Sequence, residues 1–412
     1  MYQVPHKATR RPWLLIGIAS VALLGGGLTI ARMSGPEGVS PSGQARVELP
    51  ERPAVQVVED LPQLKARLDH MAQTKQFTGA VLVAKGDQVL FRQTYGMANY
   101  EQHTPFQLDT RFRLASVSKQ FTGVAILKLQ DEGKLSVNDP ICKWIENCPD
   151  RWADIRLSNV LSHTSGIPDL MAQSNWGLVR TTPHTPEELM AKSTQYGLQF
   201  PVGTKVRYNN VGFNVGAYIV SKVSGMAYED YLKTALFEPL GMSNTGSDVH
   251  ADAQGLAMGY GLFPQGLTPQ PNANVSIIPG AGALYSTLDD MLMWNRALHG
   301  GHVLSGKSYA EFIADHAPAD TPKESGRPHR AYGLGIFANR LGERTNQPFE
   351  ELQIYHTGSW SGFRNLVTYE PSQQVTVVVL SNNYHLRDQV FLLSQQGMAE
   401  ALGHPFPTAM AR

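Results

Sequence analysis

The chain has 412 residues, of which 42% are hydrophobic and 17% charged, and its 35 basic and 35 acidic side chains balance to a formal net charge of zero. This length and composition exclude a mostly disordered chain and indicate a large core or two subdomains. The zero net charge provides no electrostatic footprint for nucleic acid. Two cysteines are too few for a disulfide-built scaffold or a Cys-only zinc site. An ordinary globular enzyme or binding protein remains.

The N-terminus combines positive charge with a long uncharged run. Residues 1–12 carry three Lys and Arg side chains, and residues 13–31 carry no charge. As a helix, 13–31 would span about 28 Å, close to the hydrocarbon thickness of a bilayer. The positive flank predicts that 1–12 is cytoplasmic and that the chain after residue 31 lies outside the cytoplasm. We expect a retained signal anchor at 13–31, with a cleaved signal peptide as the alternative.

The next segment indicates a linker and an oxidising location. Residues 32–55 are rich in Pro, Gly, Ser and Glu without periodicity, and a domain at 56–405 follows them. We expect a disulfide between Cys142 and Cys148, which would stabilise the fold by about 2 kcal/mol on the loop-entropy model; two free thiols are the alternative. The predicted location is the cytoplasmic membrane with the domain in the periplasm or outside the cell, or secretion if the signal is cleaved.

The predicted elements run from strands to helices and back to strands. Helical spacing covers 60–76, a hairpin with Gly86-Asp87 at its turn joins 80–83 to 89–91, and a helix follows at 117–132. To about residue 330 the pattern is mainly helical. We predict later helices at 186–193, 211–224, 228–237, 288–298 and 388–402, and strands at 333–338, 366–370 and 375–381.

This order predicts an α/β fold of the α+β kind. Joining the early hairpin to the late strands makes one antiparallel sheet, flanked by the N-terminal and C-terminal helices. The helical section then forms a second, mainly helical lobe beside the sheet. A cleft between the two is the usual place for a site.

The first candidate site motif is Ser116-Val117-Ser118-Lys119. At the start of a helix, Ser116 and Lys119 lie one turn apart on the same face. A lysine with a lowered pKa can remove the proton of a serine hydroxyl or hold the true base in place, and the helix N-terminus offers N–H groups to an oxyanion. The alternative for this motif alone is a capped surface helix with an exposed lysine.

Two further motifs follow in the chain. Tyr208 could serve as general base and then acid beside a lysine, and Asn210 could bond a substrate carbonyl or the lysine. His356-Thr357-Gly358 precedes a predicted strand and could donate to a carboxylate or carbonyl, while the N–H of Ser359 could be a second oxyanion donor. Taken singly, a loop tyrosine and a surface turn are the alternatives.

Together the three motifs resemble the serine β-lactamase and penicillin-binding protein superfamily. More narrowly they are similar to its class C and DD-peptidase branch, in which tyrosine replaces serine in the middle motif. The segments 112–116, 161–167, 237–242 and 280–287 are also similar to short sequence segments typical of that family. The resemblance covers roughly residues 60 to 400 and implies a β-lactamase/transpeptidase-like fold with a five-stranded-type antiparallel sheet.

The resemblance also implies roles by position. Ser116 would be the acylated nucleophile and Lys119 and Tyr208 the proton-handling pair, and N–H groups of Ser116 and Ser359 would form the oxyanion hole. The site residues expected to hold the substrate are Asn210, His356, Thr357, Gly358 and Ser359. His163 belongs to the segment 161–167, which forms a structural turn in the family.

One position departs from the best-known lactamases, because His356 stands where they carry lysine. A histidine is largely neutral above pH 7, so we expect weaker and pH-dependent recognition of anions there. Arg364 could supply the missing cation, with an exposed strand arginine as the alternative.

The function expected is an extracytoplasmic serine hydrolase that acts through an acyl-enzyme on an amide, ester or β-lactam carbonyl, of D-alanyl-peptidase, esterase or β-lactamase type. The alternative is a penicillin-binding sensor or peptidoglycan-binding protein without efficient turnover. Expected partners are a small-molecule or peptide substrate and, through the N-terminal helix, the membrane. We expect no cofactor and no metal, because the thirteen histidines show no metal spacing and no P-loop or Gly-x-Gly-x-x-Gly occurs. The sequence leaves the oligomeric state open.

Overall fold

The computed structural model describes residues 60–270, 274–318 and 329–411. The segments predicted up to residue 55, including the anchor, lie outside these residues. Among the residues described, no helix has the length and hydrophobicity needed to cross a bilayer. The domain limits predicted at 56–405 stay a prediction.

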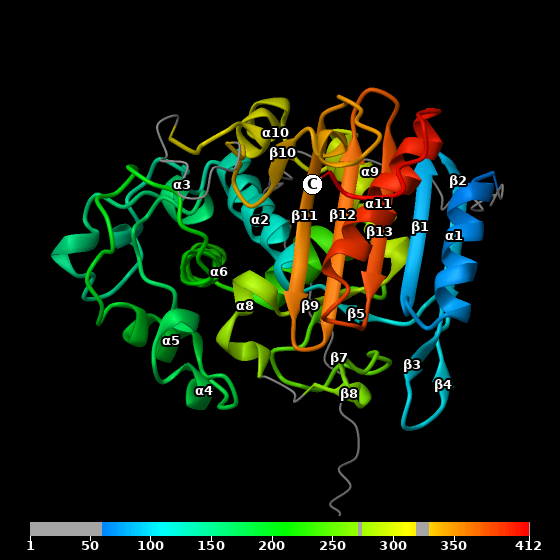
Figure 1. Ribbon diagram of the computed structural model, residues 1–412. Helices are drawn as coiled ribbons and strands as arrows, with labels where there is room; N and C mark the ends of the chain where they lie inside the picture. Colours follow the sequence, from blue (N-terminus) through cyan, green and yellow to red (C-terminus); the bar gives the residue numbers. More distant parts are fainter. Residues whose placement is uncertain (1–59, 271–273, 319–328, 412) are drawn as a thin grey trace, which may run out of the picture. The chain divides into compact units, whose positions relative to one another are not determined.

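A six-stranded sheet forms the centre of the fold, in the order β10-β11-β12-β13-β1-β2 (Figure 1). Every neighbouring pair is antiparallel. The early hairpin therefore joins the late strands, as predicted, with β1 paired to β13 across valine-rich registers such as Val83 opposite Val377. The strands are β1 (Gly79–Lys85), β2 (Gln88–Tyr95), β10 (Phe337–Asn339), β11 (Gln353–Trp360), β12 (Phe363–Glu370) and β13 (Val375–Ser381).

The β10–β11 edge differs from the sequence expectation. The sixth strand, β10, is short, and the residues predicted to begin it at 333–336 pack instead as a loop, in which the N–H of Leu334 donates to the carbonyl of Phe312 at 2.9 Å. β11 contains His356, Thr357 and Gly358, which the sequence placed before a strand. Its mixed polar and glycine sequence lacks the alternation that marks a half-buried strand.

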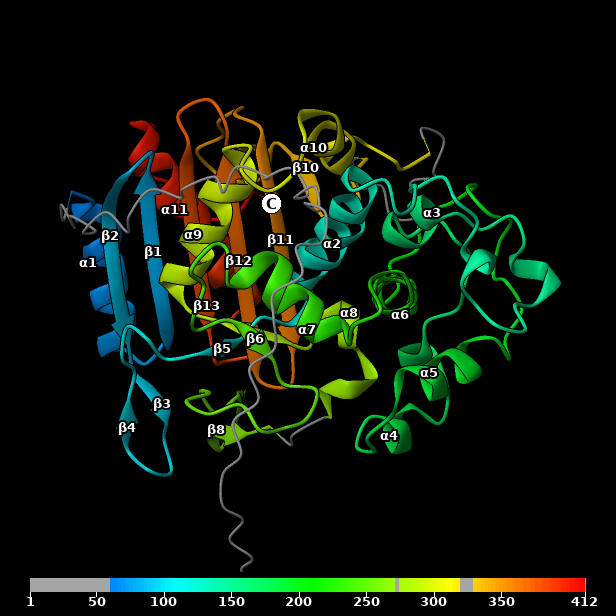
Figure 2. The ribbon, with the colours of Figure 1, turned by 180° about the vertical axis from the view of Figure 1, so that it is seen from behind.

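Helices cover both faces of the sheet (Figures 1 and 2). α1 (Pro62–Gln73) and α11 (Arg387–Leu402) pack on the outer face, where residues such as Leu64 and Leu393 form one core cluster. α2 (Lys119–Asp131) and α9 (Leu288–His299) lie on the inner face, where Phe121 and Trp294 stack at 4.1 Å between ring centroids. Apolar side chains on both faces explain why β13 is buried along its whole length.

The mainly helical lobe lies beside the sheet (Figure 1). The helices predicted at 186–193 and 211–224 coincide with α5 and α6, and the one predicted at 228–237 is α7 continued by a π-helical turn, η5. The other α-helices and the π-helical turn of the described residues are α3 (Leu157–Leu161), α4 (Trp176–Val179), α5 (Pro186–Ser193), α6 (Val211–Ser224), α7 (Tyr228–Leu232), η5 (Lys233–Phe237), α8 (Pro279–Gly282) and α10 (Gly306–Ile313).

Three small sheets complete the described part. They pair β3 with β4, β7 with β8, and β9 with both β5 and β6. In the third of these sheets, strand β5 leads directly into the short 3-10 helix η1 (Ala115–Ser118) and then α2. The strands are β3 (Met97–Asn99), β4 (Thr104–Pro105), β5 (Phe112–Arg113), β6 (Gly246–Ser247), β7 (Tyr260–Phe263), β8 (Gly266–Pro269) and β9 (Leu284–Ser286).

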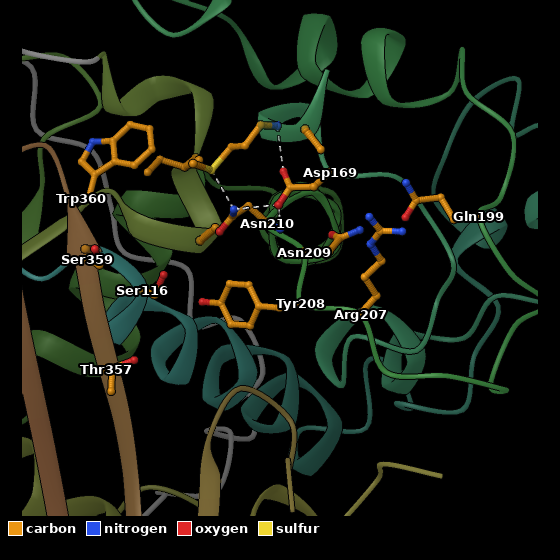
Figure 3. Close-up of a pocket in the computed structure, with 15 residues that line it drawn as sticks. Ser116, Asp169, Gln199, Arg207, Tyr208, Asn209, Asn210, Thr357, Ser359 and Trp360 are labelled. Carbon is orange, nitrogen blue, oxygen red and sulfur yellow. Dashed lines mark hydrogen bonds between the residues drawn. The ribbon is translucent and has the colours of Figure 1, made fainter. Parts of the chain in front are cut away.

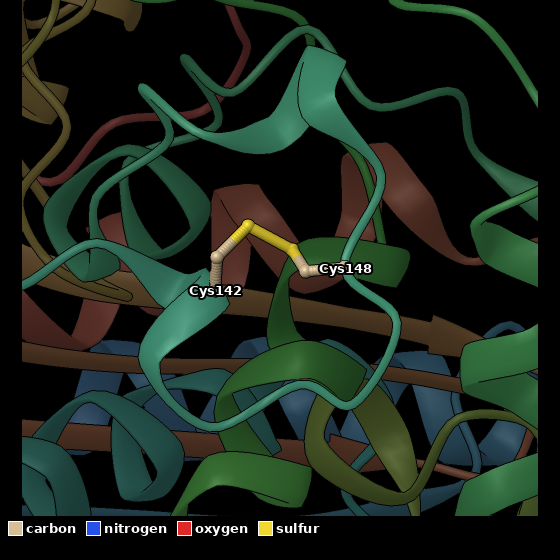
Figure 4. The surroundings of a disulfide bond; sticks show 2 residues. All are labelled: Cys142 and Cys148. Carbon is tan, nitrogen blue, oxygen red and sulfur yellow. A yellow bond between two sulfur atoms is a disulfide. The ribbon is translucent and has the colours of Figure 1, made fainter.

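The predicted disulfide is present in the helical lobe (Figure 4). Cys142 and Cys148 are bonded, with their Cα atoms 5.3 Å apart, within the usual range for a bridge. The bond closes a short loop between α2 and α3.

Candidate active site

Ser116 stands where a short strand turns into the central helix. The N–H of Leu114 donates to the carbonyl of Leu284 at 2.8 Å, and the Ser118 hydroxyl accepts from the N–H of Leu284 at 3.2 Å, so β9 fixes both ends of the turn. Between them Ala115 adopts a φ of 51°, a left-handed conformation that is rare outside glycine and costs about 1 kcal/mol. The neighbouring contacts therefore hold the nucleophile candidate in a strained turn.

Lys119 lies one turn further along and is completely buried. Its Nζ is 3.1 Å from Ser116 Oγ, 2.8 Å from Asn210 Oδ1 and 2.9 Å from the carbonyl of Ala281. Burial lowers the pKa of Lys119 to about 7, against the opposing influence of the Asp169 charge. A neutral amine has two N–H donors, which the oxygens of Asn210 and Ala281 accept, so its lone pair is directed at the Ser116 hydroxyl.

Asp169 holds Asn210 in place. One oxygen of its carboxylate accepts from the backbone N–H of Asn210 at 3.0 Å and from the Asn210 side-chain amide at 2.9 Å, and the other accepts from the N–H of Met171. These bonds fix the amide so that its Oδ1 faces Lys119. Asp169 could not be identified from the sequence, because an aspartate after Pro168 is typical of a local helix cap and no sequence pattern links it to a residue 41 positions further on.

Tyr208 completes the group around the nucleophile. Its hydroxyl points toward Ser116 in Figure 3 and is hydrogen-bonded to it. The residue exposes 43% of its surface, but its hydroxyl end lies among protein atoms, and this burial raises the pKa of Tyr208 well above its ordinary value. The Lys119 Nζ lies over its ring, 4.8 Å from the centroid. Tyr208 is therefore protonated in the resting site and is a proton donor.

The open edge of β11 forms the opposite wall. Trp360 and Phe363 close a two-residue turn, in which Ser361 and Gly362 both have positive φ, so this closing pair is the hydrogen-bonded kind. Alternation along the ladder then turns the backbone N–H of Ser359 away from β12 and toward the edge. The predicted oxyanion donor is thus directed to the side on which Ser116 lies.

Gly358 lets the open edge of β11 approach the turn that carries Ser116. A Cβ at this position would lie 2.1 Å from the carbonyl oxygen of Leu114. The side chain of Asn365, opposite Gly358 on β12, donates to the carbonyl of Arg113 at 2.8 Å and ties the sheet to the same turn. Only glycine fits such a close contact between backbones.

His356 is buried behind this wall. Its Nδ1 lies 2.7 Å from the carbonyl of Thr357 and its Nε2 lies 3.2 Å from the hydroxyl of Tyr332. Burial and then the Lys119 charge lower the pKa of His356 to about 3. The ring is therefore neutral at any physiological pH, so the expected pH-dependent charge at this position is wrong, and its contact with substrate stays a prediction.

His163 supports Tyr208 from below. Its Nδ1 accepts from the backbone N–H of Asn209 at 3.2 Å, and its ring centroid lies 4.3 Å from that of Tyr208. Burial and then the Lys119 charge lower the pKa of His163 well below its ordinary value. This neutral, packed ring agrees with the structural role expected for His163 in the segment 161–167.

A cavity of about 500 Å³ opens over these groups (Figure 3). Ser116 lies between Tyr208 and the β11 wall, and Arg207 and Gln199 lie beyond Tyr208. His356 and Gly358 do not line the cavity. No cluster of three or more His, Cys, Asp or Glu side chains suited to a metal occurs in the described ranges. The polar and aromatic residues that line it are Ser116, Asp169, Gln199, Arg207, Tyr208, Asn209, Asn210, Thr357, Ser359 and Trp360.

Comparison with known proteins establishes the family. The model of the Beta-lactamase family matches residues 64–394. The chain belongs to this family. Penicillin-binding protein 4* of Bacillus subtilis (strain 168) is 26% identical over 342 residues, which are 77% of this chain and 71% of that protein.

Solved structures agree with the fold. An octameric penicillin-binding protein homologue from Pyrococcus abyssi is 26% identical, with a TM-score of 0.70 over 84% of this chain and 78% of that one. The D-amino acid amidase of Ochrobactrum anthropi SV3, solved with D-phenylalanine, has a TM-score of 0.71 over 84% of this chain and 99% of that one. At 21% identity the latter likeness shows the fold alone. The family assignment makes the chain a serine hydrolase of the β-lactamase and penicillin-binding protein superfamily.

Proposed function

We propose that this hydrolase forms an acyl-enzyme on Ser116 and acts on amide, ester or β-lactam carbonyls outside the cytoplasm. One observation carries the proposal: a buried lysine with a pKa of about 7 has its Nζ 3.1 Å from the Ser116 hydroxyl. At neutral pH about half of such a lysine is neutral, the form that accepts a proton.

Acylation follows from this arrangement. Lys119 Nζ takes the proton as Ser116 Oγ bonds to the carbonyl carbon, and the carbonyl electron pair moves to the oxygen. The N–H groups of Ser116 and Ser359 are the donors that would hold this oxyanion. Two preorganised donors in a partly closed cavity stabilise charge more strongly than water does, because they need no reorientation.

The leaving group requires a proton, which Tyr208 is placed to give. When the tetrahedral intermediate collapses, the bond from carbon to nitrogen or oxygen breaks and the leaving atom takes the Tyr208 proton. The Lys119 ammonium then gives up its proton and Tyr208 regains one, so that both groups return to their starting protonation states. Water repeats the addition and releases the acyl group, with Ser116 regaining its proton.

The substrate class is proposed from the cavity and the relatives. Gln199, Arg207 and Trp360 add polar, cationic and aromatic contacts on either side of the nucleophile, a lining suited to a short peptide or a similar small molecule. Relatives and structural neighbours are named as penicillin-binding proteins and a D-amino acid amidase. We therefore place D-alanyl peptides, D-amino-acid amides, esters and penicillins first among the substrates to test.

The proposed location rests on two features. Residues 13–31 have the length and lack of charge of a signal anchor, with basic residues before them. Cys142 and Cys148 form a disulfide, and such bonds persist mainly in oxidising compartments. Both features support a domain tethered to the outer surface of the cytoplasmic membrane.

Steady-state turnover of an activated ester, a D-amino-acid amide, a D-alanyl-D-alanine peptide and a penicillin tests the proposed function. The full chain is expected to turn over at least one of them, Ser116→Ala none, and the matched control Ser221→Ala, on α6 outside the cavity, should behave as wild type. A lasting adduct without turnover would identify the penicillin-binding sensor instead. Turnover that survives Ser116→Ala would contradict the proposal.

A further inference from the structure

A second, smaller cavity of about 180 Å³ lies on the outer face of the sheet, where β11 and β12 meet the start of α11. It has room for about six water molecules. Thr357 lines both this cavity and the one over Ser116, so the two cavities are neighbours at β11. Its charged residues are Arg330, Arg344, Arg364, Arg387 and Asp388.

Aromatic rings lie against three of the guanidinium groups. Arg364 lies over the Tyr384 ring at 5.0 Å and its Nε donates to the Tyr384 carbonyl at 3.3 Å. Arg344 and Arg330 lie over the rings of Phe391 and Phe337, at 4.9 and 5.8 Å. Stacking of this kind fixes the plane of a guanidinium, and for Arg330 and Arg364 it leaves N–H groups that can bind a ligand. This sets the orientation of the cluster before any ligand is present.

The charges around this cavity are unbalanced. Within the described ranges, Arg330, Arg364 and Arg387 form no ion pair. Arginines elsewhere do form ion pairs, for example Arg92 with Asp289 and Arg113 with Asp248. Among the described residues that line the cavity, Asp388 is the only one with a carboxylate. Positive charges that converge in a partly enclosed space repel one another, and a bound anion relieves the repulsion.

We propose that this cavity binds a tetrahedral oxyanion with two or more negative charges, of the phosphate type. A single carboxylate would balance only part of the excess charge, whereas guanidinium forks match the paired oxygens of a phosphate. Arg387 opens the sixteen-residue helix α11, whose N-terminus also favours an anion. The sequence offered two interpretations of Arg364, a cation for the site over Ser116 and an exposed strand arginine; in the structure it lines this second cavity.

The phosphate can come from two sources. It can be free in solution, or it can be carried by a substrate whose reacting carbonyl lies at Ser116 and whose anionic end passes around the β11 edge at Thr357. The site is the same in both cases, and binding is measured directly, so its outcome does not depend on turnover.

Calorimetric titration of the full chain with inorganic phosphate, in low-salt buffer with chloride as the reference anion, tests the proposal. We expect saturable binding of one phosphate per chain that weakens as sodium chloride is added. Arg364→Gln and Arg387→Gln should each weaken it roughly tenfold, and Arg364→Lys less. Arg340→Gln removes an exposed arginine that pairs with Glu343 and does not line the cavity, and it should change nothing.

Circular dichroism spectra and thermal unfolding midpoints equal to those of the wild type show that Arg364→Gln and Arg387→Gln are folded. Absence of saturable phosphate binding in the wild type, or equal binding in these variants, would overturn the proposal, as would an equal loss in Arg340→Gln.

A competition experiment then distinguishes the two sources of the phosphate. Phosphate that raises KM for a phosphate-bearing ester and not for a neutral ester identifies a substrate group, and no effect on either KM identifies the free anion; both results retain the site.

Discussion

At the scale of single residues, the lowered pKa of Lys119 links burial to catalysis. Its ammonium form has three N–H donors and three oxygen acceptors around it, yet burial outweighs these contacts. Burial of Lys119 therefore costs part of the free energy of folding. It also provides a base that is partly unprotonated near neutral pH.

The lysine sets the acid side of the pH profile. Below about pH 7 Lys119 is protonated and cannot accept the Ser116 proton, so kcat/KM should rise about tenfold per pH unit up to that value and then level off. Initial rates with a neutral ester from pH 5 to 9 measure this. Lys119→Met should lose activity, and Lys128→Met, on the same helix outside the cavity, should retain the profile. A flat profile across this range would contradict the assignment.

Asp169 acts through its neighbours as a positioning residue. Asp169→Asn replaces a charged acceptor of Asn210 amide donors, so Asn210 should lose its fixed orientation and kcat should fall about a hundredfold. Because the Asp169 charge raises the Lys119 pKa, its removal should also move the acid limb to lower pH. The same pH series checks both effects. The exposed Asp154→Asn is the control, and an acid limb that moves upward would refute the role.

At the scale of elements, the approach of β11 to η1 builds the site. The strand edge supplies the Ser359 donor, while the turn supplies Ser116, and Gly358 allows contact between them. Neither element makes a site alone. The geometry depends on packing between segments that lie more than 200 residues apart in the chain.

Gly358→Ala tests this contact. Its Cβ would meet the Leu114 carbonyl, so the variant should lose about 1–3 kcal/mol of unfolding free energy together with most ester turnover. Urea denaturation followed by tryptophan fluorescence measures the stability. Gly306→Ala, at the start of α10 where a Cβ meets nothing within 4 Å, should be as stable as wild type or slightly more so. Equal behaviour of the two variants would argue against the close approach.

Local spacing explains which elements could be predicted from the sequence. Ser116 and Lys119 are one helical turn apart, so their proximity follows from helix geometry, and the β1–β2 hairpin follows from its turn residues. Asp169 and the face of β11 could not be predicted in this way, because their positions depend on tertiary contacts across the chain. The burial that makes His356 neutral also results from tertiary packing, so it could not be predicted from the neighbouring residues in the sequence.

At the scale of the whole molecule, the expected anchor connects the hydrolase to a membrane. Full-length chain produced in a bacterial host should sediment with the cytoplasmic membrane, with its domain open to protease added to the periplasm, because residues 13–31 are long and uncharged. A chain starting at residue 46 should be absent from the membrane pellet. A periplasmic chain with a shortened N-terminus would identify the cleaved signal, and a full-length chain in the cytosol would contradict the location.

The fold as a whole places a nucleophile and a protonated tyrosine at one cavity, with a buried lysine beside the nucleophile. Acylation of Ser116 is the step that this arrangement predicts. Rapid mixing with a slowly released ester or a penicillin, followed by acid quench, intact-mass measurement and peptide mapping, tests it most directly. We expect a mass increase equal to one acyl group, located on Ser116 and absent from Ser116→Ala. An adduct on another residue, or turnover with no adduct under any of these conditions, would contradict it.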